Sequence, residues 1–556
     1  MLKRRQLLVG GVAVAGAGGA ACLYYRSRAS QAFGDGPFRH YPFDPVAAQN
    51  FQQKLFIPVG SGPFGVLDVA APLKIRATAA NFPLLPSPAS QAPSPFLVYQ
   101  TEHAGQAYQN PILRIESGAR FTASLDNALT EPTIIHWHGL HTPAKMDGHP
   151  RDTIAPGARY DYDFTVRNRG GTYWYHTHAH ELTAKQAYNG LASFFLVDDE
   201  NQRTLAKALS LQLGVTDLPL VIQDKQFDAL GALVYRPNAH ESMMGWLGDI
   251  VLVNLTPNAV HTVTPRTYRL RLLNGSNARI YRLAFVKAET SLPFTVIGTD
   301  GGLIERPETV TEAFLAPGER LDVLFDAGQA QPGETVFLSS LAFDPMENEG
   351  GMSGMGGMGN QGNQGNQGMS RMMAGMGSSR LPLGAAFNVL KLSVTASERV
   401  VATLPATLSE VKPIRTEGAP ERKIELSMQH MRFLINGRTF RMDEIAFEVK
   451  RGAVEIWRIS NPAVGMPHPM HIHGFSFQVL ERLGSPPQWS AMARFGKGRA
   501  VSDLGWKDTV LVWPGETVRI AIDFAHDFPG NQTYVFHCHN LEHEDAGMMI
   551  NFRVQA

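Results

Sequence analysis

The sequence predicts an all-β protein built from antiparallel sandwiches or barrels. Most of the chain consists of short runs in which apolar and polar residues alternate, such as RIESGARFTASL at residues 114–125. Gly, Pro, Asn and Asp bound these runs, which is the pattern of strands joined by turns. The 53 glycines and 36 prolines also favour a loop-rich β protein over a helical one.

Composition restricts the possible functions. The 556 residues are 44% apolar and 18% charged, so a large core can form and the length predicts about three or four domains. Lys+Arg and Asp+Glu number 50 each, and this zero net charge gives no support to a nucleic-acid partner. Only two cysteines are present, which excludes a disulfide framework.

Residues 1–32 resemble an export signal of the twin-arginine type. A basic stretch at residues 3–5, KRR, precedes a Gly- and Ala-rich, weakly apolar run at residues 7–23. A membrane anchor is the alternative, but this run is short and weakly apolar for a stable span. Lipidation at Cys22 also stays open. We expect a periplasmic or otherwise exported mature protein that does not span the membrane and that keeps one cysteine, Cys538.

One pattern recurs three times along the chain. Each copy has a Pro-Gly turn, an alternating strand, a Gly-containing turn and a second strand, and the copies span residues 152–178, 311–340 and 508–539. The first and third copies end in His-x-His, whereas the second ends in Leu-Ser-Ser. We therefore expect three copies of one domain, of which the middle one carries no metal at this position. The Pro-Gly pairs are interpreted as turns only.

An insert rich in Met, Gly, Asn and Gln occupies residues 346–380. It holds eight of the 20 methionines and cannot form a packed core. Thioether sulfur is a soft ligand suited to Cu(I), so we interpret the insert as a copper-capturing segment, with a flexible linker as the alternative. Its candidate Cu(I)-binding residues are Met352, Met355, Met358, Met369, Met372, Met373 and Met376.

Four His-x-His pairs indicate a metal cluster. They lie in strand-like surroundings, where side chains at i and i+2 share one face, so each pair points two imidazoles in one direction. All eight can converge only if the first and third domains meet face to face. The pairs are His136/His138, His176/His178, His471/His473 and His537/His539.

Cys538 lies between the two histidines of the last pair, so the same rule points its sulfur to the opposite face. There it can meet His468, His543 and Met548. Two His, one Cys and a distant Met are the ligands of a blue-copper electron-transfer site, and a structural zinc site is the alternative. Electrons could pass from Cys538 to its neighbours, where eight imidazoles suit three copper ions and four electrons could reduce O2 to water.

At these residues the chain resembles the multicopper oxidases. HWHG, HTH, HPMHIH and HCHNLEHEDAGM match the four copper motifs of that family, in its order, within roughly residues 95–556. The resemblance implies four copper ions and three cupredoxin-like Greek-key domains, which we place at residues 45–205, 215–398 and 420–556. It makes Cys538, His468 and His543 the type 1 ligands with Met548 axial, His136 and His471 the type 2 ligands, and His138, His176, His178, His473, His537 and His539 the ligands of the type 3 pair.

Within that family the chain looks most like the bacterial copper-efflux oxidases, which oxidise Cu(I) to Cu(II). The export signal, the methionine-rich insert and Met466, two residues before His468, support this reading. The pattern departs from that of relatives at one point. They often place acidic residues beside such a methionine, whereas Val464, Gly465 and Pro467 are not acidic.

Reduction of O2 also requires protons. The family match supports Asp147 and Glu544 as proton relays near the cluster, and surface or capping carboxylates are the alternative reading. His141, His149 and His180 lie near the motifs but outside the paired pattern, and we interpret them as loop histidines.

The sequence thus predicts an exported, monomeric cuprous oxidase that couples oxidation of Cu(I) to reduction of O2 to water. A laccase-like oxidase of phenols and aromatic amines is the second hypothesis, and activity on phenols without added copper would favour it. A resistance protein that sequesters copper without turnover is the third hypothesis. The predicted blue-copper site argues against storage, since storage does not need one.

Overall fold

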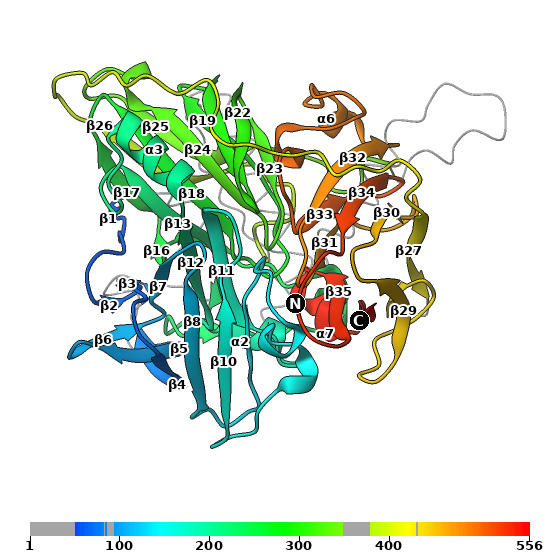
Figure 1. Cartoon of the computed structure of the whole chain (residues 1–556). Coiled ribbons are helices and arrows are strands. Elements are labelled where there is room, and N and C mark those ends of the chain that lie inside the picture. Colours follow the sequence, from blue (N-terminus) through cyan, green and yellow to red (C-terminus); the bar gives the residue numbers. More distant parts are fainter. Residues whose placement is uncertain (1–49, 83, 86–93, 349–378, 430–431) are drawn as a thin grey trace, which may run out of the picture.

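The structure is a computed structural model of the chain, and it describes residues 50–82, 84–85, 94–348, 379–429 and 432–556. The predicted export signal at residues 1–32 lies outside these ranges, as do the seven candidate methionines between Met352 and Met376. The described residues form three β units, of which two lie on the left of Figure 1 and the third on the right.

The first unit consists of two sheets that share one core. Its strands are β2 (Gly62–Pro63), β3 (Val66–Asp68), β4 (Leu73–Phe82), β5 (Ser94–His103), β6 (Gln106–Gln109), β7 (Ile112–Glu116), β8 (Arg120–Asn127), β9 (Ile135–His136), β10 (Arg159–Thr165), β11 (Gly171–Thr177) and β12 (Ala192–Asp198). The sheets run β10-β8-β4-β5-β6-β2 and β3-β7-β12-β11-β9. On β4, Leu73 and Ile75 are buried and Lys74 and Arg76 are exposed, as alternation requires.

The second unit has the same two-sheet architecture. Its strands are β1 (Gln53–Lys54), β13 (Asp217–Phe227), β14 (Leu233–Val234), β15 (Ile250–Val253), β16 (Thr256–Pro257), β17 (Ala259–Val263), β18 (Thr267–Asn274), β19 (Tyr281–Lys287), β20 (Thr290–Leu292), β21 (Phe294–Thr299), β22 (Gly302–Val310), β23 (Ala313–Leu315), β24 (Arg320–Asp326), β25 (Thr335–Ser340) and β26 (Phe387–Val394). The sheets run β1-β17-β26-β25-β19-β20 and β16-β15-β13-β18-β24-β21-β22. β1 pairs in parallel with β17, although we placed its residues in the first domain.

The third unit contains the two sheets β28-β27-β30-β34-β32 and β29-β36-β35-β31-β33. Its strands are β27 (Glu421–Gln429), β28 (Arg432–Ile435), β29 (Ile445–Lys450), β30 (Val454–Ser460), β31 (His468–Ile472), β32 (Phe477–Leu483), β33 (Thr509–Val512), β34 (Thr517–Asp523), β35 (Gln532–Cys538) and β36 (Met549–Gln555). The core between these sheets includes Cys538, Met548 and Met466. The predicted all-β fold is confirmed.

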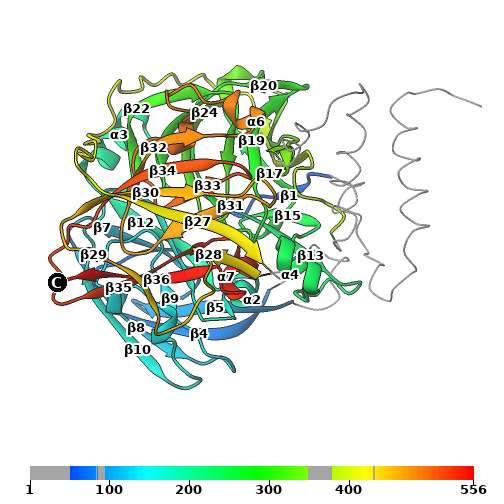
Figure 2. The same cartoon turned by 90° about the vertical axis from the view of Figure 1, so that its right-hand side faces the viewer.

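Short helices lie where the units meet. They are α2 (Thr183–Tyr188), α3 (Glu200–Leu209), α4 (Ala239–Met244), α6 (Pro487–Ser490) and α7 (Leu541–Asp545). α2 of the first unit lies beside α7 of the third (Figure 2), and the carboxylate of Asp545 accepts the backbone N–H groups of Thr183 and Ala184 at 3.0 and 2.9 Å. Among the helices of the described ranges, none has both the length and the apolar character needed to cross a membrane.

Candidate metal centre

The four His-x-His pairs occupy equivalent places in the first and third units. In each pair the first histidine lies on a strand and the second follows the end of that strand, on β9, β11, β31 and β35. His136 of β9 is the cross-strand partner of His176 of β11, and His471 of β31 is the partner of His537 of β35. All eight side chains are at most 1% exposed.

The structure brings the two sets of histidines together across the boundary between the units. The Nε2 atoms of His136 and His471 are 3.4 Å apart, and those of His178 and His537 are also 3.4 Å apart. The rings of His136 and His473 stack with centroids 3.6 Å apart. The eight imidazoles therefore form one buried cluster between the first and third units.

The hydrogen bonds of these rings indicate a cation site. Nδ1–H of His136 donates to the carbonyl of Asp147 at 2.7 Å, and Nδ1–H of His471 donates to the carbonyl of Asp508 at 2.8 Å. A carbonyl only accepts, and burial lowers the pKa of both imidazoles, so each neutral ring carries a lone pair on Nε2. Two lone pairs facing each other at 3.4 Å repel unless a cation lies near them. Imidazole is a ligand that copper accepts, so the donor set fits this metal.

His539 has a different environment from the other rings. Within the described part of the chain, neither of its ring nitrogens has a hydrogen-bond partner, although the side chain is 1% exposed. Its ring centroid lies 5.0 Å from that of His138 and 5.3 Å from that of His176. Buried polar atoms are normally satisfied, so these free nitrogens are further evidence of a metal ligand.

The thiol of Cys538 points away from this cluster, into the core of the third unit. Its Sγ lies 3.5 Å from Nδ1 of His468 and 3.6 Å from Nδ1 of His543. Nε2–H of His543 donates to the carbonyl of Met243 at 2.8 Å, which leaves the lone pair of Nδ1 directed at the sulfur. Met548 is buried in the same core, and its carbonyl accepts the N–H of Cys538 at 3.0 Å. Burial raises the pKa of the thiol, so a metal must displace its proton on binding.

A tight turn after β35 returns His543 to the sulfur. Cys538 ends the strand, and Asn540 caps α7 by accepting the backbone N–H of His543 at 3.4 Å. The side chains of His537 and His539, on either side of Cys538, point the other way and belong to the eight-imidazole cluster. The two candidate sites therefore lie back to back, as the alternation of the strand predicts.

Two buried carboxylates contact the cluster from different sides. Oδ2 of Asp147 accepts Nδ1–H of His473 at 2.7 Å, and burial raises the pKa of this acid. Oε2 of Glu544 lies 3.2 Å from Nδ1 of His537, and Oε1 lies 3.5 Å from Nε2 of His178. Burial opposes ionisation of Glu544, but the neighbouring imidazoles outweigh it and lower its pKa to about 2. The surroundings therefore raise the pKa of Asp147 and lower that of Glu544, so Asp147 holds its proton more tightly.

Sequence reasoning missed a third carboxylate, that of Asp508. Its Oδ1 lies 3.0 Å from Nε2 of His138 and 3.4 Å from Nδ1 of His471, and it pairs with the buried Arg320 of the second unit. The available signal was the repeat itself, because Asp508 opens the third copy as Asp152 opens the first.

The other nearby histidines have partners away from the cluster. His141 bonds the carbonyl of Gly474 at 2.6 Å, and His149 bonds the side chain of Asn551 at 2.8 Å. His180 is 33% exposed. None of the three joins the eight rings, in line with their interpretation as loop histidines.

Comparisons with known proteins decide the family. Three family models described as multicopper oxidase match residues 100–202, 235–350 and 414–556. A multicopper oxidase of Staphylococcus haemolyticus is 32% identical over 80% of this chain and 81% of its own length. The chain belongs to the multicopper oxidase family. It is therefore an oxidoreductase that uses copper and has O2 as its electron acceptor.

Other proteins similar to this chain differ in their described roles. A laccase of Bacillus subtilis is 32% identical over 75% of this chain and 78% of its own length. The cell division protein FtsP of Photorhabdus laumondii is 29% identical over 90% and 97% of the two chains. The crystal structure of McoA multicopper oxidase from Aquifex aeolicus matches with a TM-score of 0.77 and 39% identity, covering 91% of this chain and all of that one.

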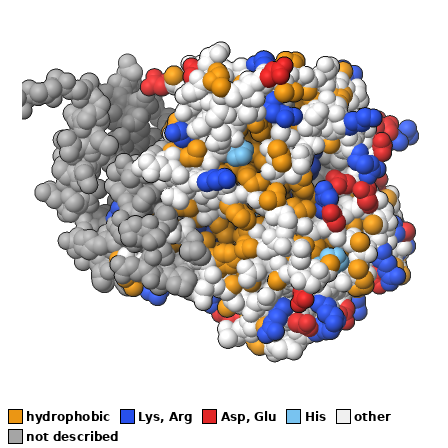
Figure 3. Space-filling model, turned by 90° about the vertical axis from the view of Figure 1, so that its left-hand side faces the viewer, with side chains coloured by type: hydrophobic (Ala, Val, Ile, Leu, Met, Phe, Trp, Pro, Cys, Tyr) orange, Lys and Arg blue, Asp and Glu red, His pale blue; other side chains and the backbone are white. Residues whose placement is uncertain are grey.

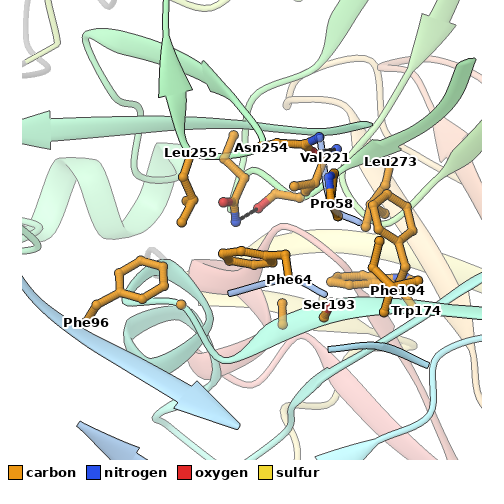
Figure 4. Close-up of a pocket in the computed structure, with 15 residues that line it drawn as sticks. Pro58, Phe64, Phe96, Trp174, Ser193, Phe194, Val221, Asn254, Leu255 and Leu273 are labelled. Carbon is orange, nitrogen blue, oxygen red and sulfur yellow. Dashed lines mark hydrogen bonds between the residues drawn. The ribbon is translucent and has the colours of Figure 1, made fainter. Parts of the chain in front are cut away.

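A pocket between the first and second units approaches the cluster of this multicopper oxidase from outside. On the side of the molecule that Figure 3 shows, which is the left-hand side of Figure 1, apolar side chains gather across the middle. Phe64, Phe194 and Leu273 line the pocket together with Trp174 (Figure 4). The indole of Trp174 stacks on His176 with centroids 4.3 Å apart, so one aromatic ring separates the pocket from the histidines.

The copper-free protein is expected to lose stability steeply below pH 6.5. Burial lowers the pKa of His149, His176 and His543 from 6.5 to about 3, so the unfolded chain binds more protons than the folded one between these values. Stability is therefore present above pH 6.5 and lost as the pH falls toward 3, at about 2 kcal/mol per histidine by pH 5. Thermal unfolding of the apoprotein from pH 8 to pH 5 measures the effect. A midpoint that does not change with pH would contradict it.

Proposed function

We propose that this multicopper oxidase is an exported cuprous oxidase that oxidises Cu(I) with O2. It would hold a type 1 copper at Cys538, His468, His543 and Met548. The other three ions would lie among the eight imidazoles, with His136 and His471 at type 2 and His138, His176, His178, His473, His537 and His539 at the type 3 pair. When bound, these ions carry electrons from four Cu(I) to one O2, which takes up four protons and gives two waters.

Methionines in and around the core that contains Cys538 support Cu(I) as the substrate. Met466 is 5% exposed and belongs to the same core as Cys538. Met243, Met244 and Met346 are partly buried and pack against that core. Met243 and Met244 end α4, and sequence reasoning overlooked them because neither lies in the insert or near a copper motif. Thioethers are soft ligands that select Cu(I).

The described ends of the methionine-rich insert support the same reading. On one side, the amide of Asn348 donates to the carbonyl of Pro514 at 2.7 Å, and Met346 packs on the core that contains Met466. On the other side, the hydroxyl of Ser379 donates to the carbonyl of Gly248, four residues after α4. The residue before the insert's undescribed part thus contacts the third unit, and the residue after it lies near the helix that carries Met243 and Met244.

The protein's own groups supply the rest of the chemistry. Neutral imidazoles present lone pairs, and the backbone carbonyls that accept their N–H groups fix the ring orientations. We assign Asp147 and Glu544 to proton delivery, because both are buried within hydrogen-bond range of the cluster. Export by the basic stretch at residues 3–5 remains part of the proposal.

Oxygen uptake driven by Cu(I) tests the proposal, with Met466→Leu as the decisive variant. Leucine keeps the volume and removes the sulfur, so we expect the KM for Cu(I) to rise about tenfold while turnover of a phenol is unchanged. Deletion of residues 349–378 should raise the KM for Cu(I) as well and should improve phenol turnover. Met470→Leu, a buried methionine of the same core, is the matched control.

The outcomes separate three functions. Equal kinetics of Met466→Leu and the parent protein with Cu(I) would contradict direct delivery at Met466. High phenol activity of the intact protein without added copper would favour the laccase-like alternative, which the Bacillus subtilis relative supports. Copper binding without oxygen uptake would favour sequestration.

A further inference from the structure

The second unit carries no His-x-His pair, but a turn of this unit lies against the cluster. Gly318 follows Pro317 in the second copy of the repeat and has φ +82°. A Cβ atom built on Gly318 would lie 2.9 Å from Cδ2 and Cγ of the His539 ring. The backbone of the turn is therefore the wall against which this imidazole rests.

Arg320, two residues further, binds all three units together. Nε donates to the carbonyl of Thr172 at 3.1 Å. Nη1 donates to the carbonyl of Gly318 at 2.7 Å and to Oδ1 of Asp508 at 2.9 Å. Nη2 donates to the carbonyl of Asp300 at 3.1 Å and pairs with the second oxygen of Asp508. All five N–H groups are satisfied, and the side chain is buried.

Asp508 links Arg320 to the histidine cluster. Arg320 holds both oxygens of the carboxylate, and Oδ1 also lies 3.0 Å from Nε2 of His138. The glycine of the HWHG motif, Gly139, leaves space for the ion pair of Arg320 and Asp508. Its φ is +84°, and a Cβ atom there would clash with Asp508 and lie 2.9 Å from Nη2 of Arg320. The glycine after His138 is thus explained by a contact with the second and third units.

A second ion-pair group anchors the same turn. Nζ of Lys507 lies 2.9 Å from Glu319 and 3.0 Å from Asp300, and all three side chains are buried. The other oxygen of Glu319 accepts the N–H of Ala316 at 2.8 Å and closes the turn. The turn is consequently held from both sides and cannot shift freely relative to the third unit.

We propose that Gly318 and Arg320, the clamp residues of the second unit, position the imidazoles of His539 and His138 for copper. The ligand-free unit then sets the copper affinity of a cluster whose ligands all come from the other two units. This inference rests on the proposed copper cluster. Both clamp residues act through other side chains, so they are positioning residues rather than ligands.

Gly318→Ala tests the clamp against two matched controls. Gly157 and Gly515 occupy the equivalent turns of the first and third copies with φ +79° and +73°, so alanine is equally strained there. A Cβ meets nothing within 4 Å at Gly157, and its nearest neighbour at Gly515 is 3.6 Å away. Only at Gly318 does the added methyl push on an imidazole.

The readout is copper bound per chain at increasing chelator concentration, together with the blue band of the Cys538 site. We expect Gly318→Ala to lose cluster copper at roughly ten- to hundredfold lower chelator concentration than the parent, with the blue band retained. Gly157→Ala and Gly515→Ala should match the parent. Arg320→Lys, which keeps the charge but loses the paired contacts, should weaken cluster copper in the same way.

The failure of this inference differs from the failure of the proposed function. If Gly318→Ala and Arg320→Lys fold, keep the blue band and retain cluster copper as the control variants do, the clamp is overturned. If the parent protein itself binds no copper beyond that at Cys538, the proposed cluster fails instead. Should Gly318→Ala not fold, Arg320→Lys alone decides between these outcomes.

Discussion

Cys538→Ser is expected to abolish the blue absorption band and oxidase activity with every reductant. Serine removes the thiolate, and its hydroxyl is a poor ligand for soft copper. The sulfur is the group that lies between His468 and His543, at 3.5 and 3.6 Å from their Nδ1 atoms. Electrons then have no route from the type 1 site to the strand neighbours of Cys538.

The same variant should keep its fold, because it changes the core volume little. We expect a loss of about 1–2 kcal/mol of unfolding free energy, from placing a hydroxyl in an apolar core. Absorption spectroscopy, oxygen uptake and thermal unfolding measure the three effects. Met470→Leu perturbs the same core opposite Cys538 and should keep both colour and activity. A blue, active Cys538→Ser protein would refute the type 1 assignment.

The copper motifs could be predicted from the sequence because strand alternation is a local rule. The alternation placed Cys538 and its two neighbours on opposite faces, and the structure shows the thiol beside His468 and the flanking rings in the cluster. The repeat also indicated that both ligand-bearing units share one architecture. These inferences needed only periodicity within a strand and order along the chain.

Contacts between units could not be predicted in this way. Arg320 and Met243 reach the sites from segments far apart in sequence, and no local pattern marks them as neighbours of histidines. The turn at Gly318 looked like its two counterparts, and only its contact with His539 distinguishes it. The placement of β1 in a sheet of the second unit is likewise a long-range pairing.

Asp147→Asn is expected to slow O2 reduction without emptying the copper sites. The asparagine oxygen can still accept Nδ1–H of His473, which Asp147 now accepts at 2.7 Å, so the ring keeps its orientation. The amide cannot carry the proton that the carboxyl can. Within the described chain the second oxygen of Asp147, Oδ1, has no hydrogen-bond partner, although it lies in the cluster wall 3.6 Å from Nδ1 of His136.

General acid–base groups typically contribute 10²- to 10⁴-fold, so we expect kcat to fall by at least about a hundredfold with the KM for Cu(I) unchanged. Anaerobic bleaching of the blue band by Cu(I) should keep its rate, because that step does not involve O2. Asp545→Asn is the matched control, since this carboxylate caps α2 by accepting the backbone N–H groups of Thr183 and Ala184. It should lose stability and keep kcat. A normal kcat in Asp147→Asn, with full copper content, would show that protons reach the cluster by another group, and Glu544, the other carboxylate that we assign to proton delivery, would then be the next to test.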